Sequence, residues 1–161
     1  MYELNFTQII RRPRPEVFAF FSDIENLERI TPPWLHFKIL TSLPFNIEAG
    51  SIIDYRLKLS GMPFHWQTKI EEFQPNDFFT DTQAKVPYRY WHHLHRFTDI
   101  EGGTLMEDRI QYRLWGGPLS RPVNWLFVNR SLQKVFAYRQ QTLDTLLPPS
   151  EPSPNHEADL A

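Results

Sequence analysis

The sequence contains no cysteine, and this absence excludes several kinds of site at once. Disulfides, thiolate metal ligands, iron–sulfur clusters and thiol nucleophiles all require that residue. The sequence also lacks an excess of either charge, since 17 Lys and Arg residues face 19 Asp and Glu residues. A net charge of −2 gives no general attraction to nucleic acid or to an anionic membrane, so we expect neither as a partner.

Long hydrophobic runs and targeting signals are missing as well. The best apolar run, residues 125–128, falls far short of the ~20 residues that a membrane-spanning helix needs. The first residues lack the basic and apolar segments of a secretory signal, so we expect a cytoplasmic protein with no stable membrane insertion. There is no Gly-x-Ser-x-Gly motif and no glycine-rich loop before a helix, which disfavours hydrolases and nucleotide-binding proteins and predicts no cofactor.

What the sequence has in quantity is aromatic side chains, at 15% of 161 residues. This much bulky apolar surface is typical of a folded domain with a large core, and the length fits a single domain. We place that domain at residues 1–147. Residues 148–161 contain four prolines and three acids but no Lys or Arg, and this composition predicts a disordered tail.

The apolar periodicity predicts an α+β fold. Apolar residues alternate over residues 2–10, which indicates a strand, and two short helices follow at about residues 15–21 and 22–30. The spacing of Ser22 and Glu25 predicts a capping box for the second helix. Helical spacing returns over residues 122–147 and predicts one long amphipathic helix. Between these helices, alternation and turn residues predict antiparallel strands at residues 35–40, 51–59, 64–71, 78–84, 89–97 and 104–114.

Alternate residues of the last three strands place an unusual amount of polarity on the inner face of the sheet. We expect six polar side chains there, among aromatic residues: Asp81, Gln83, His93, His95, Asp108 and Tyr112. A buried carboxylate needs a partner, water or a ligand, because burying an unpaired charge is costly. Three interpretations stay open: Asp–His pairs that fix the strand register, a recognition site in a cavity, and acid–base catalysis by His93, His95, Asp108 and Tyr112.

The same face provides the predicted walls of a binding site for a mainly apolar molecule. Pockets for such molecules combine apolar walls with a few convergent polar groups. Arg139 falls on the apolar stripe of the long helix, where it either extends to solvent or anchors an acidic group of a ligand. Besides the six polar residues and Arg139, the predicted ligand-binding residues are Tyr55, Trp66, Phe79, Trp91, Phe97, Trp125 and Phe136.

A metal site is a further possibility that the spacing permits. His93 and His95 lie on one face of a strand, and Asp108 on the next strand could complete a three-ligand set. The sequence has no cysteine and no Glu-x-x-His helix to support this assignment. We therefore expect no metal and interpret the histidines as members of a hydrogen-bonded network.

Several segments together resemble the SRPBCC superfamily of START-like and polyketide cyclase/dehydrase-like proteins, in its bacterial ligand-binding branch. The resemblance covers residues 2–147, and its segments are residues 12–18, 26–34, 81–88, 91–97, 103–112 and 136–139. It implies a helix-grip fold, in which a curved antiparallel sheet of six or seven strands surrounds the C-terminal helix and encloses a hydrophobic cavity.

The resemblance implies binding or carriage of a hydrophobic small molecule or lipid, such as an aromatic or isoprenoid compound. One alternative is an aromatase/cyclase-like or dehydratase-like enzyme that uses the same cavity. The other is a module with a filled core that works through its surface. The sequence does not indicate an oligomeric state.

Overall fold

The protein is an open seven-stranded sheet with helices on one side, as a computed structural model shows for residues 1–59, 61–83 and 88–149. All neighbouring strands are antiparallel, in the order β1-β7-β6-β5-β4-β3-β2. This arrangement confirms the predicted α+β class and strand number. The strands are β1 (Tyr2–Ile10), β2 (Lys38–Ile39), β3 (Ile52–Leu59), β4 (Met62–Gln74), β5 (Phe78–Gln83), β6 (Tyr90–Ile100) and β7 (Gly103–Arg113).

One predicted strand is much shorter than expected, while the described ends of the others lie within three residues of the prediction. The strand predicted at residues 35–40 is reduced to the two residues of β2, because a 3-10 turn occupies Pro33–Leu35. Proline at the start of that turn favours a helical φ angle. Ala84, the predicted end of β5, and most of the predicted tail, residues 150–161, lie outside the described residues.

Two short helices follow β1, as predicted: α1 (Arg14–Ser22) and α2 (Ile24–Arg29). The predicted capping box is wrong in its cap residue. Asp23, not Ser22, caps α2, and its Oδ1 accepts a hydrogen bond from the backbone N–H of Glu25. Ser22 still belongs to α1, where its hydroxyl donates to the Phe18 carbonyl.

The C-terminal helical segment is interrupted by a wider turn. It begins with a 3-10 turn (Gly117–Leu119) and α3 (Ser120–Val123), continues through a π-helical segment (Asn124–Val128), and ends with α4 (Asn129–Leu146). The predicted long C-terminal helix is confirmed, and the π-helical turn near residue 125 is a feature that the periodicity did not indicate. A π-helical turn changes which side chain faces the sheet.

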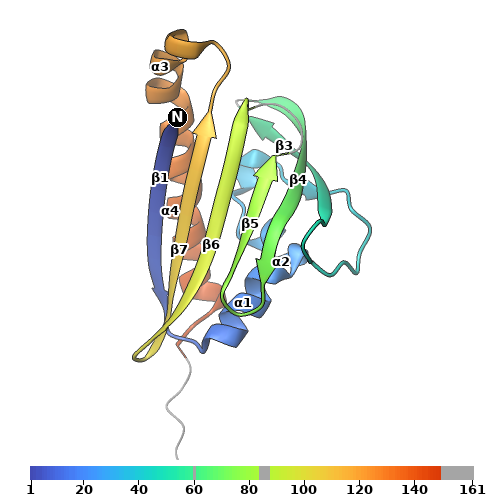
Figure 1. The fold of residues 1–161 in the computed structure, drawn as a ribbon, viewed down its shortest axis with the longest axis vertical. Coiled ribbons are helices and arrows are strands. Elements are labelled where there is room, and N and C mark those ends of the chain that lie inside the picture. The colour runs from blue at the N-terminus through green and yellow to red at the C-terminus, as the bar shows by residue number, and fades with distance from the viewer. Residues whose placement is uncertain (60, 84–87, 150–161) are drawn as a thin grey trace, which may run out of the picture.

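Helices α1, α2 and α4 lie on the same side of the sheet (Figure 1). Phe6 of β1 and Phe136 of α4 stack with ring centroids 4.3 Å apart, and Leu143 is buried near the other end of α4. At that end, the Gln8 side chain donates to Asp144 of α4, and the Gln140 side chain donates to the Thr7 carbonyl of β1. Helix α4 is thereby packed along the first strand.

No helix within the described residues is both long and apolar enough to cross a membrane.

Candidate ligand-binding site

The polar residues predicted on β5, β6 and β7 come together because of the strand register. Asp81 of β5 is paired with His93 of β6, and His95 of β6 is paired with Asp108 of β7. Directly paired residues of antiparallel strands point to the same face of the sheet. All four side chains therefore lie on the helix-covered face, as the alternation predicted.

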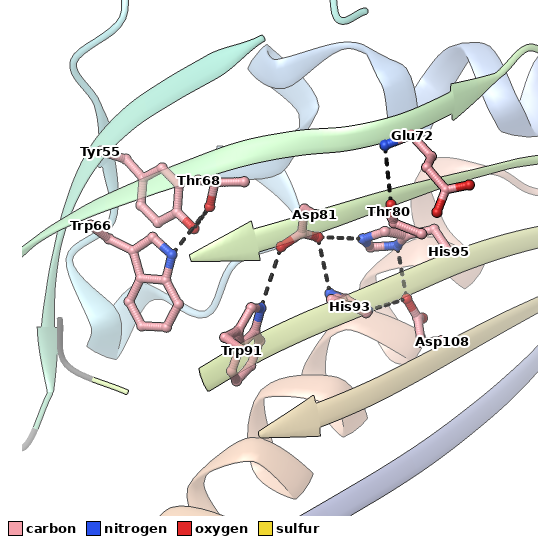
Figure 2. Close-up of polar contacts among 10 residues, drawn as sticks. All are labelled: Tyr55, Trp66, Thr68, Glu72, Thr80, Asp81, Trp91, His93, His95 and Asp108. Atoms are coloured by element: carbon pink, nitrogen blue, oxygen red, sulfur yellow. Dashed lines mark hydrogen bonds and ion pairs between the residues drawn. The ribbon is translucent and has the colours of Figure 1, made fainter. Parts of the chain in front are cut away.

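These four residues form a closed arrangement, which we call the Asp–His ring. Asp81 Oδ2 lies 3.4 Å from His93 Nδ1 and 3.1 Å from His95 Nε2. On the other side, Asp108 Oδ1 lies 2.8 Å from His93 Nε2 and 2.9 Å from His95 Nδ1. The two imidazoles lie between the carboxylates with their ring centroids 3.8 Å apart (Figure 2).

The Asp–His ring is almost completely removed from solvent. His93, His95 and Asp108 are buried, and the Asp81 side chain is 14% exposed. Asp81 also accepts a hydrogen bond at Oδ1 from the indole N–H of Trp91. The contact of His95 Nδ1 with Asp108 is short, but it is not aligned as a hydrogen bond among the described residues. Burial of this kind strengthens the electrostatic contacts among the four residues.

Burial and pairing act against each other on the four ionisable groups. Burial opposes ionisation of Asp108, but the hydrogen bond from His93 and the close contact with His95 outweigh it and hold the pKa of Asp108 below its usual value. The pKa of Asp81 is lowered as well, since the histidines outweigh its burial. Burial and the neighbouring His95 lower the pKa of His93. For His95 the two carboxylates overcome burial and raise the pKa, so the two imidazoles differ in basicity.

A cavity of about 190 Å³ lies between the sheet and the helices, and three members of the Asp–His ring, Asp81, His93 and His95, form part of its wall. Residues from α2 and from the turn after it, such as Leu27 and Leu35, complete the lining together with Leu132 of the C-terminal helix. Nine of the predicted ligand-binding residues line this cavity: Tyr55, Trp66, Phe79, Asp81, Trp91, His93, His95, Phe136 and Arg139.

Sequence reasoning missed Thr68 of β4, which lines the same cavity. Its Oγ1 accepts a hydrogen bond from the Trp66 indole at 3.1 Å and lies 2.9 Å from the Tyr55 hydroxyl (Figure 2). Burial, followed by the charge of Asp81, raises the pKa of Tyr55, so this hydroxyl stays protonated. Thr68 could have been predicted as a lining residue, because it alternates with Trp66 and Ile70 on the inward face of β4.

Among the described residues that line the cavity, Arg139 is the only Lys or Arg. Its guanidinium carbon lies 4.7 Å from the centre of the Phe136 ring, a cation–π distance. The buried Nε atom of Arg139 has no hydrogen-bond partner among the described residues. The side chain thus has a donor to offer to a bound molecule.

Five predicted ligand-binding residues lie elsewhere. Trp125 was predicted on the inner wall and this is wrong: it is 66% exposed, while the neighbouring Asn124 in the π-helical segment is buried. Phe97 is fully buried in the core beneath α1, and the Gln83 amide oxygen accepts the backbone N–H of Tyr88. Tyr112 is fully buried, and its hydroxyl donates to Asn124 Oδ1 at 2.7 Å. Asp108 lies behind the two histidines and does not line the cavity.

An antiparallel sheet closed over a C-terminal helix, with a cavity between them, defines the helix-grip class of the SRPBCC type. The chain belongs to the family described as polyketide cyclase / dehydrase and lipid transport, whose model matches residues 10–136. Both the superfamily and the fold implied by the sequence resemblance are thereby confirmed.

Solved structures show the same fold at low sequence identity. Protein CV1439 from Chromobacterium violaceum is 14% identical, with a TM-score of 0.71 over 92% of this chain and 98% of that one. Protein TTHA0849 from Thermus thermophilus is 13% identical, with a TM-score of 0.66 over 90% and 99%.

A nucleoside-diphosphate sugar epimerase from Corynebacterium glutamicum is 27% identical, with a TM-score of 0.60 over 87% of this chain but only 28% of that chain. The comparison with curated proteins gave no match.

Proposed function

We propose that this protein binds a compact, mainly apolar small molecule in the cavity between the sheet and α4. The observation that carries the proposal is the cavity itself, which is apolar over most of its wall and is also lined by Asp81, His93, His95 and Arg139. Apolar walls with a few convergent polar groups are typical of small-molecule sites. The family description, which includes lipid transport, supports the same proposal.

The volume limits the size of the molecule. A cavity of about 190 Å³ is smaller than the roughly 300–1,000 Å³ of pockets for drug-sized ligands, but larger than a cavity of about 150 Å³ that binds benzene. The cavity as it stands therefore suits a substituted aromatic ring or a short aliphatic chain. A complete isoprenoid tail or a two-chain lipid would need its walls to move apart.

The polar side chains define the other end of the molecule. Arg139 of α4 offers an unsatisfied N–H, and Tyr55, Asp81 and the two histidines of the sheet line the same cavity. A carboxylate, phenol or ketone oxygen would satisfy Arg139 without leaving the apolar part of the ligand in water. We therefore propose a ligand with one oxygen-bearing end.

A second candidate is an enzyme of the cyclase or dehydratase kind in the same cavity. The observation that favours it is the different basicity of His93 and His95, since one imidazole can accept a proton while the other donates one. The Tyr112 hydroxyl, an acid candidate from the sequence, is engaged with Asn124 and does not line the cavity. His93 and His95, with Asp81, are the residues that this alternative requires.

Binding of a defined probe tests the proposal. Isothermal titration calorimetry with 2-naphthoate, a bicyclic aromatic acid, should show one site per chain. Leu132→Trp fills the cavity from the C-terminal helix and should abolish binding, whereas Ala137→Trp adds the same side chain at an exposed position of that helix and should not. Equal binding by the two variants would contradict the cavity as the site.

The natural ligand can be sought by native mass spectrometry of the protein purified from its host. A co-purifying apolar molecule that is absent from Leu132→Trp would support the proposal. For the enzymatic alternative, His95→Gln should abolish turnover of a candidate substrate while the protein still takes up the probe.

A further inference from the structure

We propose that Asp81, His93 and His95 form a binding site for one divalent transition-metal ion at the cavity wall. Asp108 would not contact the ion but would position both histidines from behind. The site is independent of the proposed apolar ligand, because its donor atoms all belong to the protein. The sequence led us to expect no metal; the arrangement of the four side chains is what favours one.

The first argument is the number of hydrogens available to the Asp–His ring. Its two imidazoles make four nitrogen–oxygen contacts, but a neutral imidazole carries only one N–H. The two aligned contacts, His93 Nε2 to Asp108 and His95 Nε2 to Asp81, use both of these hydrogens. The lone pair of His93 Nδ1 then faces Asp81 Oδ2 at 3.4 Å and that of His95 Nδ1 faces Asp108 Oδ1 at 2.9 Å, which is an unfavourable arrangement in a buried place.

A metal ion would satisfy that arrangement. The three residues each offer one ligand atom, and these atoms lie within 4.8 Å of one another. Asp81 Oδ2 lies 3.4 Å and 3.1 Å from the two imidazole nitrogens that face it. Metal–ligand bonds of about 2.0–2.2 Å place neighbouring ligand atoms of a tetrahedral or octahedral ion at roughly 3.0–3.5 Å from each other. Both distances from Asp81 Oδ2 to the imidazole nitrogens already fall in this range.

Charge is the second argument. Asp81 and Asp108 together bring two negative charges into a site that is nearly closed to solvent. A divalent ion neutralises both of them while the imidazoles remain neutral. Asp108 then accepts the N–H of each ligating histidine, which is the usual role of a carboxylate behind a metal-bound histidine.

The kind of ion follows from the ligands. Two imidazole nitrogens and one carboxylate suit Zn²⁺, Fe²⁺ or Co²⁺, whereas Mg²⁺ and Ca²⁺ prefer oxygen ligands only. Asp81, His93 and His95 all line the cavity, and Asp108 does not. The remaining coordination positions of the ion would therefore face the cavity.

The test is titration of the full-length protein with Co²⁺ alone, followed by visible absorption, with Zn²⁺ as a competitor. We expect one equivalent of Co²⁺ to bind and Zn²⁺ to displace it. Asp81→Asn and His95→Gln should abolish this binding, and Asp108→Asn should weaken it by about 10- to 100-fold. The control is His65→Gln, because exposed His65 contacts a single carboxylate within the described part of the chain, that of Asp54, and this variant should bind as the original protein does.

Circular dichroism establishes whether each variant is folded. A second experiment uses the original protein, so its result does not depend on whether a variant folds. Nitrogen-15 NMR of the imidazoles should show Zn²⁺ shifting His93 Nδ1 and His95 Nε2 while the other nitrogen of each ring stays protonated. Shifts confined to exposed histidines such as His65, or no saturable binding at millimolar Co²⁺, would overturn the proposal. Equal Co²⁺ affinity of the original protein and folded Asp81→Asn would overturn it as well.

Discussion

His93 Nε2 and Asp108 Oδ1 lie 2.8 Å apart, and both side chains are buried on neighbouring strands of the sheet. This is the shortest of the four contacts in the Asp–His ring. The contact keeps a proton on Nε2 of His93, so that Nδ1 is the nitrogen left facing Asp81. One carboxylate behind the cavity thus determines which imidazole atom is presented at its wall.

Removing Asp108 should therefore destabilise the fold. Asp108→Leu leaves two buried imidazoles without their acceptor and should cost about 3–5 kcal/mol in the free energy of unfolding. Asp108→Asn retains one acceptor oxygen and should cost less, roughly 1–3 kcal/mol. Urea unfolding followed by circular dichroism measures both values.

The control for Asp108 is Asp99→Asn, which breaks an ion pair with Arg14 at the surface. Exposed pairs contribute at most about 1 kcal/mol, so this variant should unfold almost as the original protein does. A loss for Asp108→Leu no larger than that for Asp99→Asn would show that the Asp–His ring is not a stabilising element.

Tyr112→Phe should separate stability from ligand binding. The variant removes the hydroxyl that donates to the buried Asn124 Oδ1 and should lower the free energy of unfolding by about 1–3 kcal/mol. Since Tyr112 does not line the cavity, binding of 2-naphthoate should be unchanged. A loss of probe binding in a folded Tyr112→Phe protein would place this hydroxyl in the site after all.

The edge pairing of β1 with β7 should become weaker in acid. The Glu3 carboxylate accepts hydrogen bonds from Gln111 and Arg109, and these lower its pKa to about 2. Its folded-state pKa lies below the ordinary value, so the stabilisation is present above about pH 4.5 and is lost as the pH falls toward 2. Thermal unfolding of Glu3→Gln should differ from that of the original protein at pH 6.

At pH 2 the difference between Glu3→Gln and the original protein should disappear. The Glu3 side chain is at the surface, so the effect should be small and should shrink as salt is added. An unchanged difference across this pH range would contradict the assignment.

Trp34→Ala should change the rate of ligand uptake more than the affinity. Trp34, in the 3-10 turn after α2, contacts Tyr138 of α4 with ring centroids 5.5 Å apart. Neither residue lines the cavity, but their neighbours Leu35 and Arg139 do. Stopped-flow mixing with 2-naphthoate should show faster association for Trp34→Ala, whereas Trp115→Ala, another exposed tryptophan, should leave the rate unchanged.

Much of the sheet was predictable because one face of each strand is buried. In β6, Trp91 and Phe97 mark the inward face, and strict alternation then places His93 and His95 on that face too. In β7 the apolar residues assign Asp108 in the same way. The sequence thus identifies three members of the Asp–His ring, His93, His95 and Asp108, but not how their side chains are arranged.

The geometry was not predictable, since it depends on which residues of neighbouring strands are paired. The spacing suggested Asp108 as the carboxylate beside His93 and His95 at a metal site, but the register places Asp81 on the cavity side. The prediction that Trp125 lies on the inner wall was wrong for a different reason. Buried Asn124 is held by Tyr112 from 12 residues earlier in the chain, and apolar periodicity does not detect a polar anchor.

The way in which the C-terminal helical segment is fastened has a consequence for how a molecule enters. Tyr112 holds it to the sheet near its start, and Gln8 and Gln140 hold it to β1 near its end. Lifting the whole helix would break all of these contacts together. We therefore expect the passage to open on the far side, where α2 and the turn after it can move aside while the sheet and the helix stay joined.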